Sequence, residues 1–306
     1  MSVTNARLTY GDTNRVTDVV LNAIEILTAQ ETMVSRMIGS SVARDTVHHY
    51  QTDTLATAAS LAVQQGADLS AAALTTPSRL TNIVEEIAKV ITVARPEQVT
   101  EKFSGTDEVT RQRTKGLKDF ANALEFDLIR STLVSGVSGT VAKMSGLIEA
   151  ISKSTNTTAH TSGTVFSASI LNGLMQANWD NSNGDVATEL LMGSFLRNVV
   201  DSFTQKSNVV VNAPGIASLV RTVSSYETSF GTLMLHTHRY VQQSSDATGR
   251  ILAIRPEKLA IAWLDRPFIK PLAESGMYNK EAVYGSCTLE VRNQDSNWFA
   301  SGFDKD

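Results

Sequence analysis

The most regular pattern of apolar and polar positions in this chain lies between residues 106 and 134. Its apolar positions recur at spacings of three and four residues, as on one face of a helix: Leu117, Phe120, Ala121, Leu124 and Leu128. Ser104 or Thr106 is placed to cap the start of this helix, and Gly136 is placed to end it. The pattern predicts a helix of about 28 residues, on the order of 40 Å long, which would span a domain rather than lie inside one.

The polar side of the same stretch carries both signs of charge. Its basic residues are Arg111, Arg113, Lys115 and Lys118. Asp107 and Glu108 suit the positive end of the helix dipole, and Asp119 interrupts the basic run. This mixture favours a solvated or subunit-facing surface over a stripe that binds DNA.

The pattern is weaker toward the N-terminus. The first 15 residues are polar without a period, and we expect an extended arm there. After them, Val20, Ile24 and Leu27 recur at helical spacing and predict a short amphipathic helix. Residues 45–80 contain few large apolar side chains in an Ala- and Thr-rich stretch, so they hold little core of their own. We expect a projecting arm or loop that packs on something else.

Residues 79–103 have a mixed pattern. Ile83, Val84 and Ile87 could share one turn of helix, whereas the β-branched run at 90–93 favours a strand. Pro96 is expected to border that strand.

Short elements follow the long helix. Helices are predicted at 166–178 and 194–203, a turn at 181–184, and strands at 188–192, 208–211, 232–241, 251–254, 259–264 and 286–293. Strands and helices do not alternate as βαβ units, so the predicted class is α+β.

Composition narrows the class of protein. The chain has 306 residues, 42% of them hydrophobic, and its 27 basic and 31 acidic side chains give a net charge of −4. No apolar run approaches the roughly 20 residues that span a bilayer, and the N-terminus has no pattern of a secretion signal. A single cysteine allows no intrachain disulfide framework and suits a reducing cytoplasm. We therefore expect a folded, soluble, intracellular protein without the concentrated basic face of a nucleic-acid reader.

Sequence motifs for catalysis are missing from the chain. It contains no G-x-S-x-G nucleophile elbow, no phosphate-binding loop ending in Gly-Lys-Ser/Thr and no G-x-G-x-x-G after a strand. One cysteine also excludes a Cys-rich zinc site.

Two histidine pairs are the strongest candidates for a metal site. His236 and His238 would share one face of a strand, but no third ligand is evident near them, and an exposed or interface strand face is the favoured interpretation. His48 and His49 are adjacent, so a strand would point them to opposite faces.

Acidic residues and the cysteine also have simpler interpretations. Glu85 and Glu86 form an acidic pair, but Glu85 stands four residues before Lys89, the spacing of an ordinary ion pair on a solvated helix. Cys287 falls on the apolar face of the last predicted strand and is expected to be a buried structural thiol. The sequence therefore predicts no catalytic, cofactor-binding or metal-binding residue, and no enzyme.

The order of elements, together with several short stretches, resembles the major capsid proteins of tailed phages. These have the Hong Kong 97-like fold, which encapsulins and the herpesvirus capsid floor share. The stretches that carry the resemblance are 28–33 with 38–39, 79–82, 105–108, 115–119, 124–129, 174–175 with Trp179, 183–184, 191–193, 230–233, 239–240, Pro267, 272–276, Lys280, 288–293 and Gly302. One departure is the Ala- and Thr-rich composition of residues 50–75, which leaves the strand content of that segment open.

The resemblance implies an α+β, Hong Kong 97-like architecture in five parts. These are an N-terminal arm (1–45), an extended loop (46–104), the spine helix of a peripheral domain (105–135), an axial domain (136–222) and strands shared between the peripheral and axial domains (223–306). It implies that the arm and loop contact neighbouring subunits and that the spine helix gives the rigid backbone.

The implied function is structural. Such a protein self-assembles into hexamers and pentamers of an icosahedral shell around double-stranded phage DNA, which it touches without specificity. Its partners would be other copies of itself, a portal and a scaffolding or decoration protein, with no membrane and no cofactor. Its place would be the virion capsid, assembled in the host bacterial cytoplasm. The alternatives are an encapsulin-type shell around protein cargo, or a soluble α+β enzyme or ligand-binding protein that uses the histidine pairs.

Overall fold

A computed structural model describes residues 32–55, 59–66, 76–100, 107–137, 139–154, 156–182, 184–203, 224–273 and 276–304. The helices are α1 (Met33–Met37), α2 (Arg95–Val99), α3 (Glu108–Arg130), α4 (Leu147–Ser152), α5 (Ala168–Asn181), α6 (Ser194–Phe203) and the 3₁₀ turn η2 (Pro256–Lys258). The strands are β1 (Gly39–Val42), β2 (Val47–Thr52), β3 (Ser78–Ile83), β4 (Glu85–Ala94), β5 (Thr157–Thr164), β6 (Glu189–Met192), β7 (Ser225–Thr228), β8 (Gly231–Thr237), β9 (Gly249–Ile254), β10 (Leu259–Pro271), β11 (Tyr278–Val291) and β12 (Trp298–Phe303).

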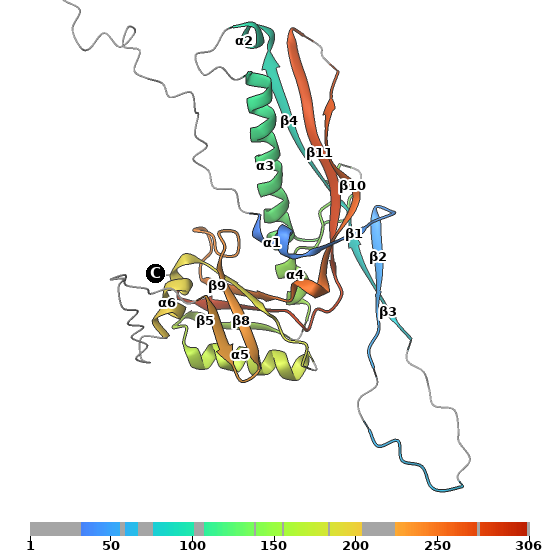
Figure 1. The fold of residues 1–306 in the computed structure, drawn as a ribbon, viewed down its shortest axis with the longest axis vertical. Coiled ribbons are helices and arrows are strands. Elements are labelled where there is room, and N and C mark those ends of the chain that lie inside the picture. Colours follow the sequence, from blue (N-terminus) through green and yellow to red (C-terminus); the bar gives the residue numbers. More distant parts are fainter. Residues whose placement is uncertain are drawn as a thin grey trace, which may run out of the picture.

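The upper part of the molecule is an elongated sheet with the long helix on one face (Figure 1). Its strand order is β1-β10-β11-β4, with β11 antiparallel to both of its neighbours. Helix α3 buries Phe120, Leu124 and Leu128 toward the sheet. A Cβ at Gly116 of α3 would lie 2.8 Å from the side chain of Ile91, so a glycine here lets the helix approach β4 closely.

The lower part is a six-stranded sheet in the order β5-β12-β9-β6-β8-β7. Helix α5 packs on one face and buries Leu171, Leu174 and Met175, in one core with residues of the sheet such as Leu190 and Leu233. In β12, Gly302 has a φ of +97°, and a Cβ there would overlap the carbonyl oxygen of His160 on β5. Glycine is the residue that fits this bulge without strain.

A two-stranded hairpin projects away from both sheets (Figure 1). Strands β2 and β3 pair from Val47↔Ile83 to Thr52↔Ser78. Beyond this pairing the chain runs outward, and Leu55 and Leu61 are 99% and 91% exposed. For the described residues of this range, the projection expected from the scarcity of apolar residues at 45–80 is therefore confirmed.

The long helix is shorter than its pattern predicts. It has 23 residues and ends at Arg130, because Ser131 takes an extended conformation and its carbonyl accepts the N–H of Gly146. The N-cap is Asp107, which accepts the N–H of Thr110 at 3.2 Å. Leu117 was expected on the buried stripe but is 45% exposed. Ser104 and Thr106 lie outside the described residues.

Some of the other predicted helices and strands match the structure, and others do not. The predicted helices at 166–178 and 194–203 and the strand at 188–192 correspond to α5, α6 and β6. The helical turn considered for residues 83–87 is wrong, because β3 pairs with β2 and β4 pairs with β11 there. Strands β10 and β11 run to 13 and 14 residues, longer than predicted, whereas β8 stops at Thr237. The arm at 1–15, the helix after it and the strand at 208–211 lie outside the described residues.

Candidate functional site: the joint between the two sheets

The chain crosses between the two sheets along three segments, which together we call the joint. They are residues 131–156 between α3 and β5, residues 255–258 between β9 and β10, and residues 292–297 between β11 and β12. The joint determines how the helix-bearing sheet is oriented on the six-stranded sheet. Side chains of the joint and of neighbouring elements form four polar groups at or beside it.

The first group is centred on Glu125 of α3, which is fully buried. Its Oε1 accepts the N–H of Val34 at 2.6 Å, and its Oε2 accepts the N–H of Ser35 at 2.9 Å. The Nε2 of His238 lies 3.0 Å from Oε1, and the side chains of both partners have no exposed surface. One carboxylate therefore joins α1, α3 and the segment that follows β8.

Hydrogen bonds decide the protonation state of this pair. The N–H of Tyr240 donates to Nδ1 of His238 at 3.2 Å, so the ring proton lies on Nε2 and is donated to Glu125. Burial raises the pKa of Glu125, but the hydrogen bonds from His238, Ser35 and Val34 outweigh it and hold the pKa below its ordinary value. The carboxylate is thus ionised in the interior and fully hydrogen-bonded.

The second group joins the end of α3 to the loop between β8 and β9. Arg130 donates two hydrogen bonds to the carboxylate of Asp246, at 2.8 and 2.7 Å, in the paired geometry that arginine and carboxylate favour. Asp246 also accepts the N–H of Gln243 at 2.8 Å, and Arg250 lies 3.2 Å away. Burial raises the pKa of Asp246, while these partners hold it below its usual range.

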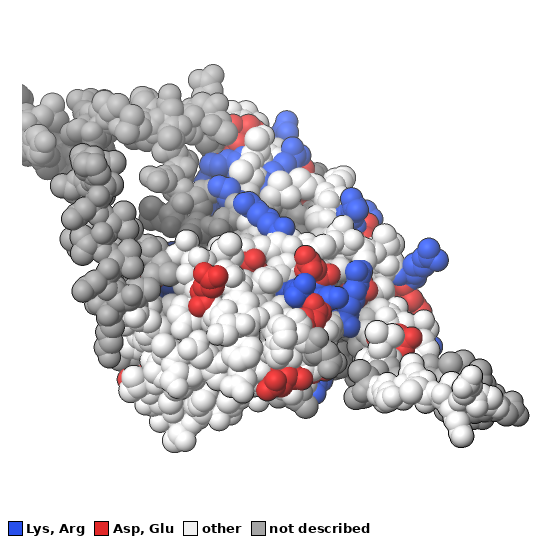
Figure 2. Space-filling model, turned by 60° about the horizontal axis from the view of Figure 1, so that its bottom comes forward, with Lys and Arg blue, Asp and Glu red and all other residues white. Residues whose placement is uncertain are grey.

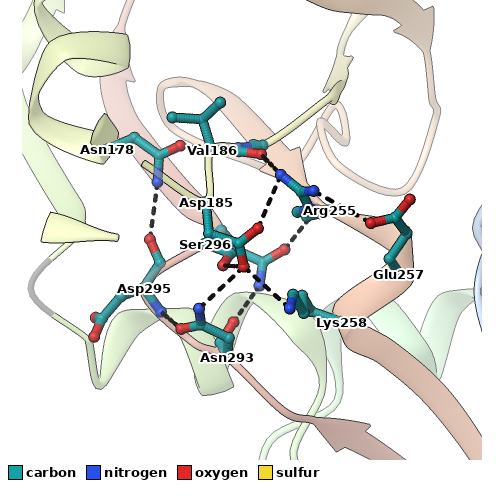
Figure 3. A network of polar contacts seen from close by, with 11 residues as sticks. Asn178, Asp185, Val186, Arg255, Glu257, Lys258, Asn293, Asp295 and Ser296 are labelled. Atoms are coloured by element: carbon teal, nitrogen blue, oxygen red, sulfur yellow. Dashed lines mark hydrogen bonds and ion pairs between the residues drawn. The ribbon is translucent and has the colours of Figure 1, made fainter. Parts of the chain in front are cut away.

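The third group is centred on Asp185, in the turn between α5 and β6 (Figure 3). Its carboxylate lies 2.9 Å from Nη1 of Arg255 and 3.4 Å from Nζ of Lys258, both in the crossing from β9 to β10. It also accepts the hydroxyl of Ser296 at 2.8 Å, in the crossing from β11 to β12. Asp185 therefore binds two crossings of the joint at once.

Amide side chains complete the third group (Figure 3). Asn178 of α5 donates to the carbonyl of Asp295 at 2.8 Å and accepts the N–H of Ala187 at 2.9 Å. Asn297 accepts the N–H of Arg255 at 2.8 Å. The two crossings are thus tied to each other and to the end of α5.

Replacing Asp185 with asparagine is expected to lower the free energy of unfolding by about 1–2 kcal/mol, because two cations and a hydroxyl lose a charged acceptor. Burial raises the pKa of Asp185, but Ser296, Arg255 and Lys258 hold it below its ordinary value. A lowered pKa contributes stability above the unfolded pKa that is lost as pH falls through the folded one. The difference between wild type and variant should therefore shrink in acid.

Glu257→Gln is the matched control, since Glu257 contacts the same Arg255 at 3.2 Å but is 77% exposed. Chemical denaturation at neutral and acid pH measures both variants. The control is expected to stay within about 0.5 kcal/mol of wild type. Equal losses in the two variants would contradict the role of Asp185.

A fourth polar group lies under the start of β4. Glu85 is 6% exposed and accepts the N–H of Met144 at 3.1 Å and the hydroxyl of Ser131 at 3.3 Å. The expectation that Glu85 sits on a solvated helix and pairs with Lys89 is wrong, since Glu85 lies on a buried strand face and Lys89 pairs with Asp119 at 3.1 Å. Burial raises the pKa of Glu85.

Asp127 of α3 and Cys287 of β11 belong to the same group. Burial, with repulsion from Glu85, raises the pKa of Asp127 to about 6. Burial and the two carboxylates raise the pKa of Cys287 to about 12. The cysteine is buried and held as a thiol, which confirms the structural role expected for it.

Asp127→Asn is expected to stabilise the protomer at pH 7 to 8, by about 1 kcal/mol after allowance for the partial exposure of Asp127. The folded pKa lies above the unfolded value of 3.8, so wild type loses stability as pH rises from about 4 to about 6, and asparagine removes that loss. Thermal unfolding of both proteins across this pH range measures the effect. Asp119→Asn on the exposed side of the same helix is the control, and a constant difference from pH 4 to 7 for Asp127→Asn would contradict the prediction.

The histidine pairs have separate partners. His236 lies 2.7 Å from Glu189, whereas His238 is buried against Glu125, so the expectation of an exposed or interface face is wrong for His238. His48 and His49 point to opposite faces of β2 as expected, and His48 stacks on Tyr50. Within the described part of the chain, no three His, Cys, Asp or Glu side chains gather as metal ligands would.

Charge is distributed unevenly over the surface. Seen from the side on which α5 lies, the body of the six-stranded sheet presents a broad area with few charged side chains, while Lys and Arg gather toward the other sheet (Figure 2). Among the helices that the structure describes, none has the length and apolarity to cross a membrane. The candidate site is therefore structural in character: a braced joint, a projecting loop and one nearly uncharged face.

Comparison with known families agrees with this character. The family model described as SU10 major capsid protein matches residues 3–302. Among curated protein sequences, none matches the chain.

Solved structures show where else this fold occurs. The capsid of an empty GTA particle is 15% identical, with a TM-score of 0.65 over 92% of this chain and 93% of that chain. A structure from Mycobacterium phage Bobi is 12% identical, with a TM-score of 0.62 over 96% and 98% of the two chains. The holo-SrpI encapsulin complex from Synechococcus elongatus gives 11% identity and a TM-score of 0.61 over 92% and 90%. These likenesses confirm the expected α+β, Hong Kong 97-like fold.

Proposed function

This chain belongs to the SU10 major capsid protein family, and on that premise we propose that it builds its icosahedral shell from hexamers and pentamers around double-stranded phage DNA. Major capsid proteins of this kind are structural components of the virion. We also propose that the chain catalyses no reaction and binds no cofactor.

The observation that carries the proposal is the hairpin and loop that project from the protomer. Leu55, Leu61 and Val63 are 99%, 91% and 65% exposed, although leucine and valine side chains favour burial. A loop that buries so little in its own subunit gains its contacts on a neighbour. Many modest contacts of this kind add through multivalency and close a shell.

The five-part division of the chain is part of the same proposal. Residues 1–45 and 46–104 act as arm and extended loop, and residues 105–135 form the spine helix of a peripheral domain. Residues 136–222 form the axial domain, and residues 223–306 supply strands to both domains. Two hydrophobic clusters support this division: one lies wholly among α5, α6 and the six-stranded sheet, and the other is centred on α3 and the helix-bearing sheet and reaches Leu252 and Phe299 of the six-stranded sheet.

Packaged DNA is the proposed content. A slightly acidic subunit, with net charge −4, does not bind the genome tightly to its wall. A portal and a scaffolding or decoration protein are the further partners, and assembly takes place in the cytoplasm of the host bacterium. The likeness to the holo-SrpI encapsulin complex supports the second candidate, a compartment around protein cargo.

Expression of the chain alone, gel filtration and negative-stain electron microscopy test the proposal. Round shells or tubes with hexagonal lattices are expected in the high-mass fraction, and a compact, stable monomer would contradict unaided assembly. The contents of particles purified with their cargo separate the two candidates. Double-stranded DNA supports the phage head, whereas a single packaged enzyme would favour the compartment.

A further inference from the structure

Side chains hold the hairpin of β2 and β3 against the body of the protomer. Among the described residues, the two strands form a sheet of their own, which shares no strand pairing with either large sheet. Three of its side chains reach the end of β11, and we call them the anchor: His48 and Tyr50 of β2 and Asn82 of β3. His48 and Asn82 stand opposite each other in the pairing register, so the anchor lies on one face of the hairpin.

Asn82 and Tyr50 form the part of the anchor that does not change charge near neutral pH. The amide nitrogen of Asn82 donates to the carbonyls of Leu289 at 2.7 Å and Ser145 at 3.1 Å. Its amide oxygen accepts the N–H of Ser145 at 2.9 Å. The hydroxyl of Tyr50 is hydrogen-bonded to the backbone of Val291, and burial raises its pKa. An amide does not titrate and this tyrosine stays protonated, so both contacts persist from mild acid to mild base.

His48 is the part of the anchor whose contact is incomplete. Its Nε2 lies 3.7 Å from Oε2 of Glu290, and the two side chains are 12% and 9% exposed. This separation is longer than a hydrogen bond, and Nε2 is buried without a hydrogen-bond partner among the described residues. Burial raises the pKa of Glu290, but hydrogen bonds from Ser41 and Arg292 outweigh it and hold the pKa below its ordinary value. A buried ring nitrogen therefore faces a buried, ionised carboxylate across a gap.

We propose that protonation of His48 closes this gap and makes the anchoring of the projecting hairpin depend on pH. An imidazolium donates a charge-assisted hydrogen bond to Glu290, whereas the neutral ring lacks that attraction. Arg292 also contacts Glu290, at 3.0 Å, but its side chain is 50% exposed, so solvent screens its charge. Ser41 and Tyr50, the other neighbours at this contact, are uncharged near neutral pH. The complete anchor therefore holds the hairpin in mild acid, and the anchor without His48 holds it in mild base.

A double-mutant cycle on unassembled protein tests the contact. Wild type, His48→Gln, Glu290→Gln and the double variant are compared by chemical denaturation at about pH 5.5 and about pH 8.5, on either side of the range in which histidine changes charge. The coupling between the two side chains is expected to change the unfolding equilibrium constant about ten-fold in acid and less than about two-fold in base. The sign follows from the proton: the contribution is present while His48 is protonated and is lost as pH rises.

His49→Gln is the matched control, since His49 lies on the opposite, exposed face of β2. All other titrating groups are common to the two histidine variants, so their effects cancel in the comparison. The difference from wild type should depend on pH for His48→Gln and stay constant for His49→Gln. A coupling of equal size at both pH values, or the same pH dependence in the two histidine variants, would overturn the inference.

The position of the hairpin gives an independent measurement that leaves His48 and Glu290 unchanged. Spin labels are attached at Gln51→Cys on the hairpin and Lys115→Cys on α3, both exposed positions, while Cys287 is buried and held as a thiol. Double electron–electron resonance should give a narrower distribution of label distances at about pH 5.5 than at about pH 8.5. Equal distributions would overturn the inference. It goes beyond the proposed function and concerns the single protomer, so a chain that forms no shells would contradict unaided assembly and leave this inference standing.

Discussion

Replacing Glu125 with alanine is expected to lower the free energy of unfolding of the protomer by about 3–5 kcal/mol, because it breaks a fully buried charged group. The N–H groups of Val34 and Ser35 and the Nε2–H of His238 would all lose their acceptor in the interior. Each such orphaned donor costs about 1–3 kcal/mol. The thermal midpoint should fall by roughly 10 °C, measured by calorimetry on unassembled protein.

Detachment of α1 from α3 provides a second measurement of the same prediction. Glu125 holds α1 against α3, so its loss should speed cleavage by trypsin after Arg36, which is exposed within α1. Asp119→Ala is the matched control on the same helix, since Asp119 and its partner Lys89 are 39% and 50% exposed. A surface pair of this kind contributes about 0–1 kcal/mol. Equal effects of the two variants, on stability or on cleavage, would refute the role given to Glu125.

Acid should affect wild type and the Glu125 variants differently. The folded pKa of Glu125 is below its unfolded value, so its contribution is present above the unfolded pKa and is lost as pH falls through the folded one. Glu125→Gln removes this titration while keeping the size of the side chain. Its pH profile is therefore expected to be flatter than that of wild type below pH 4.5.

Local patterns were enough to predict much of the fold. Helices α3, α5 and α6 and strand β6 follow from apolar spacing and turn residues near each element. The end of α3 could not be predicted in this way, because it is set by a hydrogen bond between Ser131 and Gly146 that no periodicity reveals. Strand β4 was ambiguous for a similar reason, since its pairing with β11 lies almost two hundred residues away along the chain.

The polar contacts at the joint could not be predicted from the sequence. His238 and Glu125 are 113 positions apart, and Arg130 and Asp246 are 116 apart. Nothing in the local sequence around a glutamate on a helix, or around a histidine after a strand, indicates that the two side chains meet. The sequence did not indicate that Asp185 is the centre of a polar group, because its partners come from two crossings that only the folded chain brings together.

The protomer combines a joint held by buried polar contacts with a loop whose Leu55 and Leu61 make almost no contact within the subunit. Three buried or partly buried carboxylates and the apolar cluster around α3 connect the two sheets, whereas Leu55, Leu61 and Val63, in the described part of the β2–β3 loop, are exposed to solvent. This division suits a building block, in which a fixed body defines curvature and an extended element connects copies. Changes in the joint should therefore act on folding, and changes in the loop on assembly.

Shortening the loop separates these two effects most clearly. Thr52 and Ser78 are paired across the hairpin, so residues 53–77 can be replaced by Asn-Gly, a turn that closes two antiparallel strands. The shortened protomer is expected to keep its thermal midpoint within about 2 °C, since Leu55 and Leu61 bury almost nothing. Shell formation, counted by electron microscopy and density gradients, is expected to be lost.

A Gly-Ser loop of the original length is the control. It distinguishes an effect of loop length from an effect of the apolar side chains. It retains the span of residues 53–77 but lacks Leu55, Leu61 and Val63. We expect it to form few shells, because the leucine and valine side chains supply the hydrophobic gain when they are buried on a neighbour, about 1.5–3 kcal/mol each. Repeated around a closed shell, that loss per subunit outweighs the modest stability of each contact. Shells of normal number and size from the Asn-Gly variant would show that the loop is dispensable, and the connection between copies would then have to come from the body of the protomer.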